Sequence, residues 1–152
     1  MSYNSREIDA DADTVFAVLS DPHTYPAWLV GNAEVSAVDA DWPRPGSRFH
    51  HRVGVWPFTI ADSTQLAEVE PGRLLRLNVR ARPLIRAVAT FRLLGDGERT
   101  TVSLEEEPAM RWLGAFVRPL VDPLTHLRNH ASLRRLASFI ESQERDRAAA
   151  LT

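Results

Sequence analysis

The longest regular pattern of apolar and polar residues lies between Asp122 and Arg147, where apolar positions recur at helical spacing. At about 100° per residue, one side of this segment collects His126, Asn129, His130, Leu133, Leu136, Ala137 and Ile140. The opposite side collects Arg128, Ser132, Arg134, Arg135 and Ser138. Asp122 suits the N-cap position and Pro123 the first helical position. The pattern therefore predicts an amphipathic helix of about seven turns.

Three polar side chains stand at the start of the apolar side of this helix, namely His126, Asn129 and His130. Each would cost about 1–3 kcal/mol if it were buried without a partner. An ordinary apolar core has no use for them, whereas a helix that covers a cavity does. We therefore predict a binding cavity beneath the first turns of the helix.

Alternation with a period of two predicts strands in the middle of the chain. The clearest is residues 73–82, where Leu75, Leu77, Val79 and Ala81 alternate with polar residues. Further strands are expected at 33–40, 47–56, 58–69, 86–94 and 99–107, with a weaker one at 3–9 and an irregularity near 65–68. Turn sequences such as Pro71-Gly72 separate consecutive strands, so an antiparallel meander is expected.

Two short helices are expected after the first strand. Asp11 is placed to cap one that runs to Leu19, and residues 23–29 read as a second, interrupted near Pro26. Residues 110–121 have helical spacing but contain Pro119, which predicts a broken or bent helix before the long one. The predicted fold class is α+β, a helix-grip in which an antiparallel sheet of about six to seven strands wraps on a long C-terminal helix. Residues 1–152 are expected to form a single domain.

Composition removes several classes of function. The 152 residues are 44% hydrophobic with a net charge of −2, which argues for a folded chain and against nucleic-acid binding. The chain has no cysteine, hence no disulfide or thiol nucleophile, and all 18 basic residues are arginine, so no lysine can form a Schiff base. No apolar run of membrane-spanning length and no secretory leader is evident. We expect a cytoplasmic protein without stable membrane insertion, a monomer or homodimer.

Five stretches carry a resemblance to a known family. They are DADTVFAVLSDPHTYPAWL, WPRPGSRF, EVEPGRLLRL, ERTTVSLEEE and RNHASLRRLASFIE. Together the chain resembles, over nearly its whole length, the polyketide cyclase/dehydrase branch of the START-like (Bet v 1-like, SRPBCC) superfamily. The resemblance implies a deep pocket between the sheet and the long helix, entered near the two short helices. Members of the superfamily include aromatase/cyclases and carriers of lipids and hormones.

The candidate site follows from strand parity and from the polar residues of the helix. The expected ligand-binding residues are Trp28, Phe49, His51, Leu77, Val79, Phe91, Leu104, Glu106, Trp112, Phe116, His126, Asn129, His130 and Leu133. His51 shares parity with Phe49 and is expected to face inward, whereas His50 faces outward. Trp28 and Trp112 are expected at the pocket mouth, although aromatic residues more often serve packing alone.

Two roles remain open for the polar candidates. His126, Asn129 and His130 either orient a polar group of the ligand or bond partners at the sheet rim. Glu106 either pairs with His126 or His130 as an acid–base couple or lies in water at the end of its strand. A catalytic zinc site would need His51 to converge with these groups, so neither a metal nor another cofactor is expected.

Three functions are compatible with this pattern. The first is binding of a hydrophobic or amphipathic small molecule such as a lipid, polyketide or aromatic. The second is a polyketide aromatase/cyclase or dehydratase that uses histidine and glutamate as acid and base in the same cavity. The third is an interaction module that holds a partner segment. No nucleophile motif or phosphate-binding loop is evident, so binding ranks first.

Overall fold

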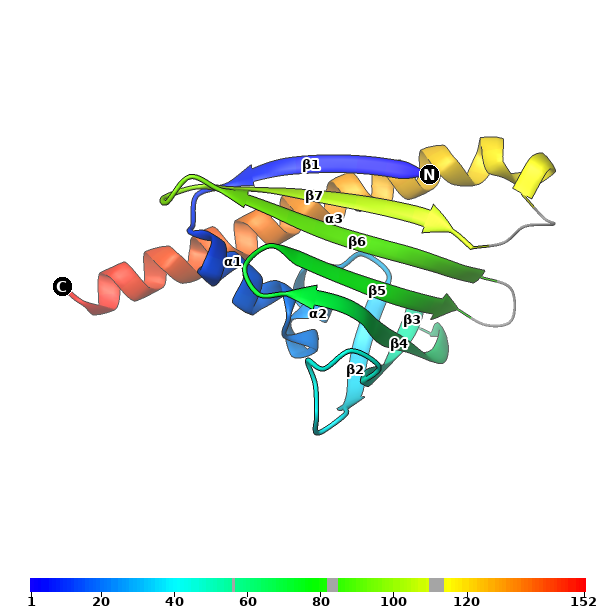
Figure 1. The fold of residues 1–152 in the computed structure, drawn as a ribbon, viewed down its shortest axis with the longest axis horizontal. Helices are drawn as coiled ribbons and strands as arrows, with labels where there is room; N and C mark the ends of the chain where they lie inside the picture. Colours follow the sequence, from blue (N-terminus) through cyan, green and yellow to red (C-terminus); the bar gives the residue numbers. More distant parts are fainter. Residues whose placement is uncertain (56, 82–84, 110–113) are drawn as a thin grey trace.

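One twisted antiparallel sheet and one long helix make up most of the fold (Figure 1). The computed structural model describes residues 1–55, 57–81, 85–109 and 114–152. The elements are β1 (Ser2–Ile8), α1 (Ala12–Leu19), the 3₁₀ helix η1 (Pro22–Thr24), α2 (Tyr25–Trp28), β2 (Asn32–Val38), β3 (Arg48–Val55), β4 (Phe58–Glu70), β5 (Leu74–Ala81), β6 (Ile85–Gly95), β7 (Thr100–Pro108) and α3 (Gly114–Ala150).

Within the described residues the strands form a seven-stranded sheet with the order β1-β7-β6-β5-β4-β3-β2. Every neighbouring pair is antiparallel, so β2 to β7 form a continuous meander and β1 joins its far edge beside β7. α3 runs along one side of the sheet, where it packs on β1, β7 and α2 (Figure 1). This arrangement confirms the α+β helix-grip class predicted from the alternating strands and the long C-terminal helix.

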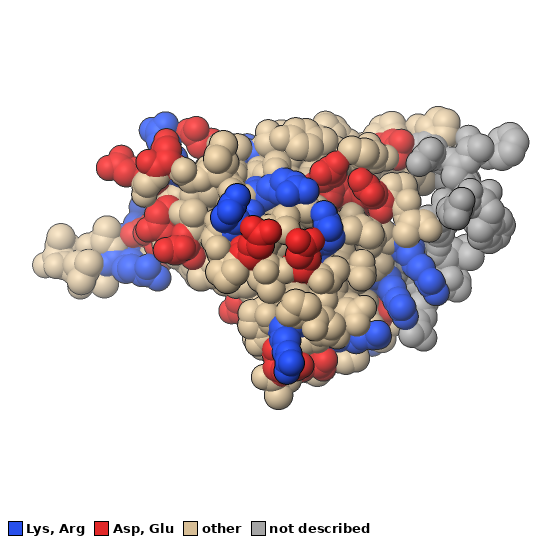
Figure 2. Space-filling model, viewed as in Figure 1, with Lys and Arg blue, Asp and Glu red and all other residues tan. Residues whose placement is uncertain are grey.

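The alternation in β5 sets the two faces of the sheet. Leu75 and Leu77 are buried in the core, whereas Asn78, the next residue along the strand, is exposed. Arg76, on the outer face, forms an ion pair of 2.9 Å with Glu68 of β4. Figure 2 shows basic and acidic side chains interspersed over the middle of the sheet. The outer face is thus a mixed-charge surface, and the inner face is left for the core and the site.

Local signals account for the elements at the N-terminal end. Asp11 caps α1 by accepting a hydrogen bond of 2.7 Å from the backbone N–H of Thr14, and this bond lowers the pKa of the Asp11 carboxyl. Val15 and Leu19 of α1 are fully buried in the core. The segment expected as one interrupted helix is divided into η1 and α2.

An irregularity in β4 was also expected, and a register shift does occur there, between Leu66 and Glu68.

The start of the long helix was predicted wrongly. α3 extends back to Gly114 and continues through Pro119 and Pro123, so Asp122 lies inside the helix rather than at its N-cap. A proline removes one helical hydrogen bond, which usually breaks a helix. Here the two prolines are four residues apart and exposed, so they share one solvent-facing side. Water can satisfy the carbonyl groups that they leave without a partner.

Between residue 119 and the end of α3, where side chains are described, the core side begins at Asn129. The buried residues of this part are Asn129, Ser132, Leu133, Leu136, Ala137 and Ile140. Ser132 was expected on the outer side, but its hydroxyl accepts a hydrogen bond of 3.1 Å from the N–H of Val30 and donates one of 2.9 Å to the carbonyl of Arg128. These bonds satisfy a buried hydroxyl and tie α3 to the loop that precedes β2.

Candidate ligand-binding site

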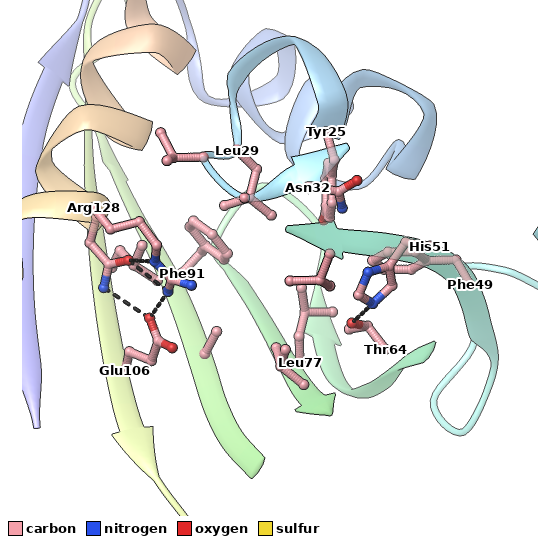
Figure 3. Close-up of a pocket in the computed structure, with 17 residues that line it drawn as sticks. Tyr25, Leu29, Asn32, Phe49, His51, Thr64, Leu77, Phe91, Glu106 and Arg128 are labelled. Atoms are coloured by element: carbon pink, nitrogen blue, oxygen red, sulfur yellow. Dashed lines mark hydrogen bonds and ion pairs between the residues drawn. The ribbon is translucent and has the colours of Figure 1, made fainter. Parts of the chain in front are cut away.

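A cavity of about 160 Å³ lies between the inner face of the sheet, the loop before β2 and the first buried turn of α3 (Figure 3). An engineered apolar cavity of about 150 Å³ holds one benzene molecule, so this space accommodates about one six-membered ring. The lining residues are Tyr25, Leu29, Val30, Gly31, Asn32, Phe49, His51, Val53, Thr64, Leu77, Val79, Ala89, Phe91, Leu104, Glu106, Arg128 and Asn129.

Strand pairing explains why the cavity opens where it does. Glu106 of β7 pairs with Ala89 of β6, and Ala89 pairs with Leu77 of β5, so the three form a row across the inner face. The neighbouring row joins Leu104 to the larger Phe91. Because Ala89 carries only a methyl group, its position in the row leaves space above the sheet.

One side of the cavity is formed by an ion pair between β7 and α3. Arg128 donates to Glu106 Oε2, and Asn129 Nδ2 donates to the same oxygen at 3.0 Å (Figure 3). Arg128 also donates to Asn129 Oδ1 at 3.0 Å. The Glu106 side chain is 14% exposed, so the two donors hold a largely buried carboxylate. Its partners are therefore Arg128 and Asn129, and neither the expected histidine couple nor full solvation is observed.

His51 lies on the other side of the cavity, pointing inward from β3 (Figure 3). Its Nε2 atom is 2.9 Å from the hydroxyl oxygen of Thr64, while its Nδ1 atom is buried and has no hydrogen-bond partner among the described residues. Burial lowers the pKa of the imidazole below its ordinary value of 6.5, with His50 adding to this effect and Asp62 opposing it. The ring is therefore neutral near pH 7. The inward orientation of His51 and the outward orientation of His50 agree with the strand parity.

The buried imidazole predicts a pH dependence of stability. Below pH 6.5 the unfolded chain protonates His51 before the folded chain does, because the folded pKa is lower. The stability linked to His51 is thus complete above about pH 6.5 and is lost as the pH falls toward the folded pKa. We expect His51→Leu to lose less stability than wild type in urea unfolding between pH 7.5 and 5.5. The control is His23→Leu, at an exposed position, which should lose as much stability as wild type over this pH range. If the free energy of unfolding changed equally with pH in all three proteins, the assignment would be refuted.

Asn32 is a lining residue that the sequence did not indicate. It is 9% exposed, and within the described part of the chain its Oδ1 atom has no hydrogen-bond partner. Gly31 before it has a φ of 93°, and its carbonyl accepts a hydrogen bond of 2.9 Å from Gly54 of β3. Gly54 itself has a φ of 126°, and a Cβ there would lie 2.3 Å from the carbonyl oxygen of Phe58. Gly54 thus permits the close approach of β3 to β4, and its bond to Gly31 fixes the turn that leads into Asn32.

Trp28 and Leu133 are core residues rather than lining residues. Trp28 is fully buried, and its Nε1 donates a hydrogen bond of 3.1 Å to the hydroxyl of Thr24. Tyr25, whose ring contacts the indole of Trp28, is itself a lining residue of the cavity. The Tyr25 hydroxyl donates a hydrogen bond of 2.6 Å to the carbonyl of Leu19. Burial raises the pKa of Tyr25 far above its ordinary value, so this hydroxyl stays protonated.

His126 and His130 do not lie in the cavity. Both side chains are exposed, and the His126 backbone carbonyl accepts a hydrogen bond of 3.2 Å from Asn4 of β1. The buried stripe of α3 is centred nearer Ser132 than the sequence suggested, which turns His130 outward. His126 precedes the first buried residue in the part of α3 whose side chains are described. Trp112 lies outside the described residues, and Phe116 lies in α3 where only the backbone is described.

The lining therefore contains eight of the expected residues, namely Phe49, His51, Leu77, Val79, Phe91, Leu104, Glu106 and Asn129. Ligand binding by these residues stays a prediction. Of the residues missed, Val53 and Ala89 share strand parity with named residues of their own strands, so parity could have found them. Thr64 lies on β4, where no residue was named, opposite Phe49 of β3 and Val79 of β5. Among the described residues no group of three or more His, Cys, Asp or Glu side chains is arranged to hold a metal ion.

The chain belongs to the family described as polyketide cyclase/dehydrase and lipid transport, whose sequence profile matches residues 2–141. This confirms the resemblance inferred from the five sequence stretches. No curated protein matches the chain.

No helix in the described part of the chain combines the length and apolar character needed to cross a membrane.

Solved structures share the fold. The Zhui aromatase/cyclase from Streptomyces sp. R1128 is 17% identical, with a TM-score of 0.72 over 91% of this chain and 92% of that one. TTHA0849 from Thermus thermophilus is also 17% identical, with a TM-score of 0.66 over 93% and 97%. The di-domain aromatase/cyclase StfQ of the steffimycin biosynthetic pathway is 10% identical, with a TM-score of 0.66 over 93% of this chain and 50% of its own.

Proposed function

We propose that the protein binds a hydrophobic or amphipathic small molecule in the cavity between the sheet and α3. The observation that carries the proposal is a ring-sized, mostly apolar cavity whose lining also includes a few polar side chains, among them His51 and Asn32. Ligand sites typically combine apolar walls with a few polar groups of this kind. Membership of a family of cyclases, dehydrases and lipid carriers supports the same function.

The position of Ala89 provides the test. Ala89→Leu adds three carbon atoms at the centre of the cavity floor, so we expect binding of an environment-sensitive apolar dye to fall at least tenfold, a loss of about 1.4 kcal/mol. The matched control is Ala61→Leu on β4, where the alanine is exposed and does not line the cavity. Dye fluorescence measures affinity, and circular dichroism verifies that both variants fold. Equal affinities in the two variants would place the dye elsewhere and contradict the proposal.

Catalysis by acid–base chemistry is a second candidate, and the observation that favours it is His51. His51 lines the cavity, and its lowered pKa leaves the imidazole neutral near pH 7, the form that can accept a proton. Three of the structural neighbours are described as aromatase/cyclases. The same binding experiment separates the candidates when a poly-β-ketone is the ligand: recovery of the unchanged compound supports binding, and a product that disappears in His51→Leu supports catalysis.

A further inference from the structure

Arg128 brings a positively charged group to the cavity. It lines the space together with Glu106 and Asn129, and in Figure 3 its side chain reaches from α3 to the side of the cavity opposite His51. The Arg128 side chain is 40% exposed, whereas that of Glu106 is 14% exposed. Arg128 is therefore the more accessible half of the ion pair.

Two of the three guanidinium nitrogens are held by neighbouring side chains. Nε donates to Asn129 Oδ1 at 3.3 Å, and Nη2 donates both to the same oxygen at 3.0 Å and to Glu106 Oε2. Asn129 is fully buried, and its Nδ2 donates to Glu106 Oε2 at 3.0 Å, which closes a ring of three side chains. Because a guanidinium group is planar and rigid, bonds that hold Nε and Nη2 also fix the direction of Nη1.

Nη1 of Arg128 is the nitrogen that remains for a ligand. Among the described residues it donates no hydrogen bond, and it is not one of their buried polar atoms without a partner, so its N–H groups are accessible. A guanidinium group has donors and no acceptor, so it bonds only to a group that accepts. A bond from it to a carbonyl oxygen is charge-assisted, and apolar surroundings strengthen such a bond relative to water.

The other polar side chains of the lining offer less to a ligand. The hydroxyl groups of Tyr25 and Thr64 are bonded within the protein, and Nδ2 of Asn129 is used in the ring of three side chains. Asn32 also carries an amide group, but the residue is only 9% exposed. Of these side chains, Arg128 presents the most accessible donor.

We propose that Arg128 is a specificity-determining residue of the cavity and that its Nη1 donates to a carbonyl oxygen of the ligand. Glu106 and Asn129 are positioning residues, because they hold the guanidinium group and leave Nη1 to the ligand. The ring or chain of the ligand lies against the apolar walls while its carbonyl oxygen faces α3. The inference rests on the proposed binding function and adds the chemical class of the ligand.

Two probes of matched shape test the role of Arg128. Cyclohexanone and methylenecyclohexane share a six-membered ring, which fits the cavity, and differ only in C=O against C=CH₂. NMR titration of backbone amides at pH 7 gives both dissociation constants, and their ratio is the readout because a loosened cavity affects both probes. We expect Arg128→Met, which keeps the length of the side chain and removes its donors, to lower the preference for cyclohexanone at least tenfold relative to wild type.

Two further variants control for position and for charge. Arg135→Met is the same substitution two turns further along the same flank of α3, at an exposed position outside the lining, and should keep the wild-type ratio. Arg128→Met alone leaves the Glu106 carboxylate largely buried without its cation, which can prevent folding. The double variant Arg128→Met/Glu106→Gln removes both charges and should show the same loss of preference.

The positioning role of Glu106 has its own test. Glu106→Ala frees the guanidinium group to turn away, so the preference for cyclohexanone should fall although Arg128 is present. Glu106→Gln keeps an acceptor oxygen for Arg128 and should restore most of the preference. A merely structural role would change the affinity for both probes equally, so an unchanged ratio in Glu106→Ala would exclude positioning.

A measurement on wild type decides the inference without any variant. The carbonyl ¹³C resonance of bound cyclohexanone should be displaced from its position in cyclohexane, because a donated hydrogen bond polarises the carbonyl group. A resonance that matches the hydrocarbon solvent overturns the inference, as does a wild-type ratio in both Arg128→Met and the double variant; cavity binding then stands. If neither probe shifts amides around the cavity and the dye is also unaffected by Ala89→Leu, the proposed function is overturned as well.

Discussion

Leu133→Ala is expected to lower the free energy of unfolding by about 2–5 kcal/mol. Leu133 is 1% exposed and belongs to the core that α3 forms with the sheet. Truncation removes three buried carbon atoms and leaves a void that the surrounding strands fill only in part. Leu133 does not line the ligand cavity, so the loss should appear in stability rather than in direct ligand contact.

Arg135→Ala is the control for this substitution, because Arg135 lies two residues away on the exposed side of the same helix. We expect its free energy of unfolding to change by less than about 0.5 kcal/mol. Urea unfolding followed by circular dichroism gives both values from the midpoint and slope. Similar midpoints for the two variants would mean that the assigned core side of α3 is wrong.

The sheet could be predicted because its signal is local and repeated. In β5 the period-two alternation of Leu75 and Leu77 with polar residues identifies both the strand and its buried face. The N-cap at Asp11 is likewise decided within three residues of sequence. Seven consecutive or edge-joined strands then leave few topologies, and the antiparallel meander is the one with the shortest connections.

The orientation of α3 was harder to predict because apolar and small polar residues both occupy its core side. Ser132 is buried and His130 is exposed, the reverse of what their polarity and position suggested. A serine suits a tight helix–loop contact because its hydroxyl is small and can use both Val30 and a backbone carbonyl of its own helix. Such pairing depends on a segment about 100 residues away, which a helical pattern does not contain.

The polar groups of the cavity depend on tertiary contacts in the same way. Glu106 was found by strand parity, but its partner Arg128 was assigned to the outer side of the helix. A long arginine side chain can reach around the flank of a helix to a carboxylate on the sheet. Asn32 gave no signal at all, since the turn that leads into it depends on the positive φ of Gly31 and on the bond between Gly31 and Gly54.

Trp28→Ala is expected to lower the free energy of unfolding by about 3–5 kcal/mol. The indole is fully buried, and its ring packs edge-on against Tyr25 at 5.0 Å and Phe91 at 6.1 Å between centroids. Its N–H is bonded to Thr24, so truncation removes both packing and a satisfied donor. The sequence had suggested a ligand contact at the pocket mouth, which would predict a small change in stability and a large change in binding.

Phe58→Ala is the matched control for Trp28→Ala, because Phe58 is an aromatic residue that is 85% exposed. Its stability should stay within about 0.5 kcal/mol of wild type. Thermal and urea unfolding of both variants, with dye affinity measured on the folded protein, separates the two roles of Trp28. A Trp28→Ala protein as stable as Phe58→Ala but defective in dye binding would restore the ligand-contact role. A large loss of stability instead means that α2 supports the cavity from behind, because Tyr25 and Phe91 contact both the indole and the ligand space.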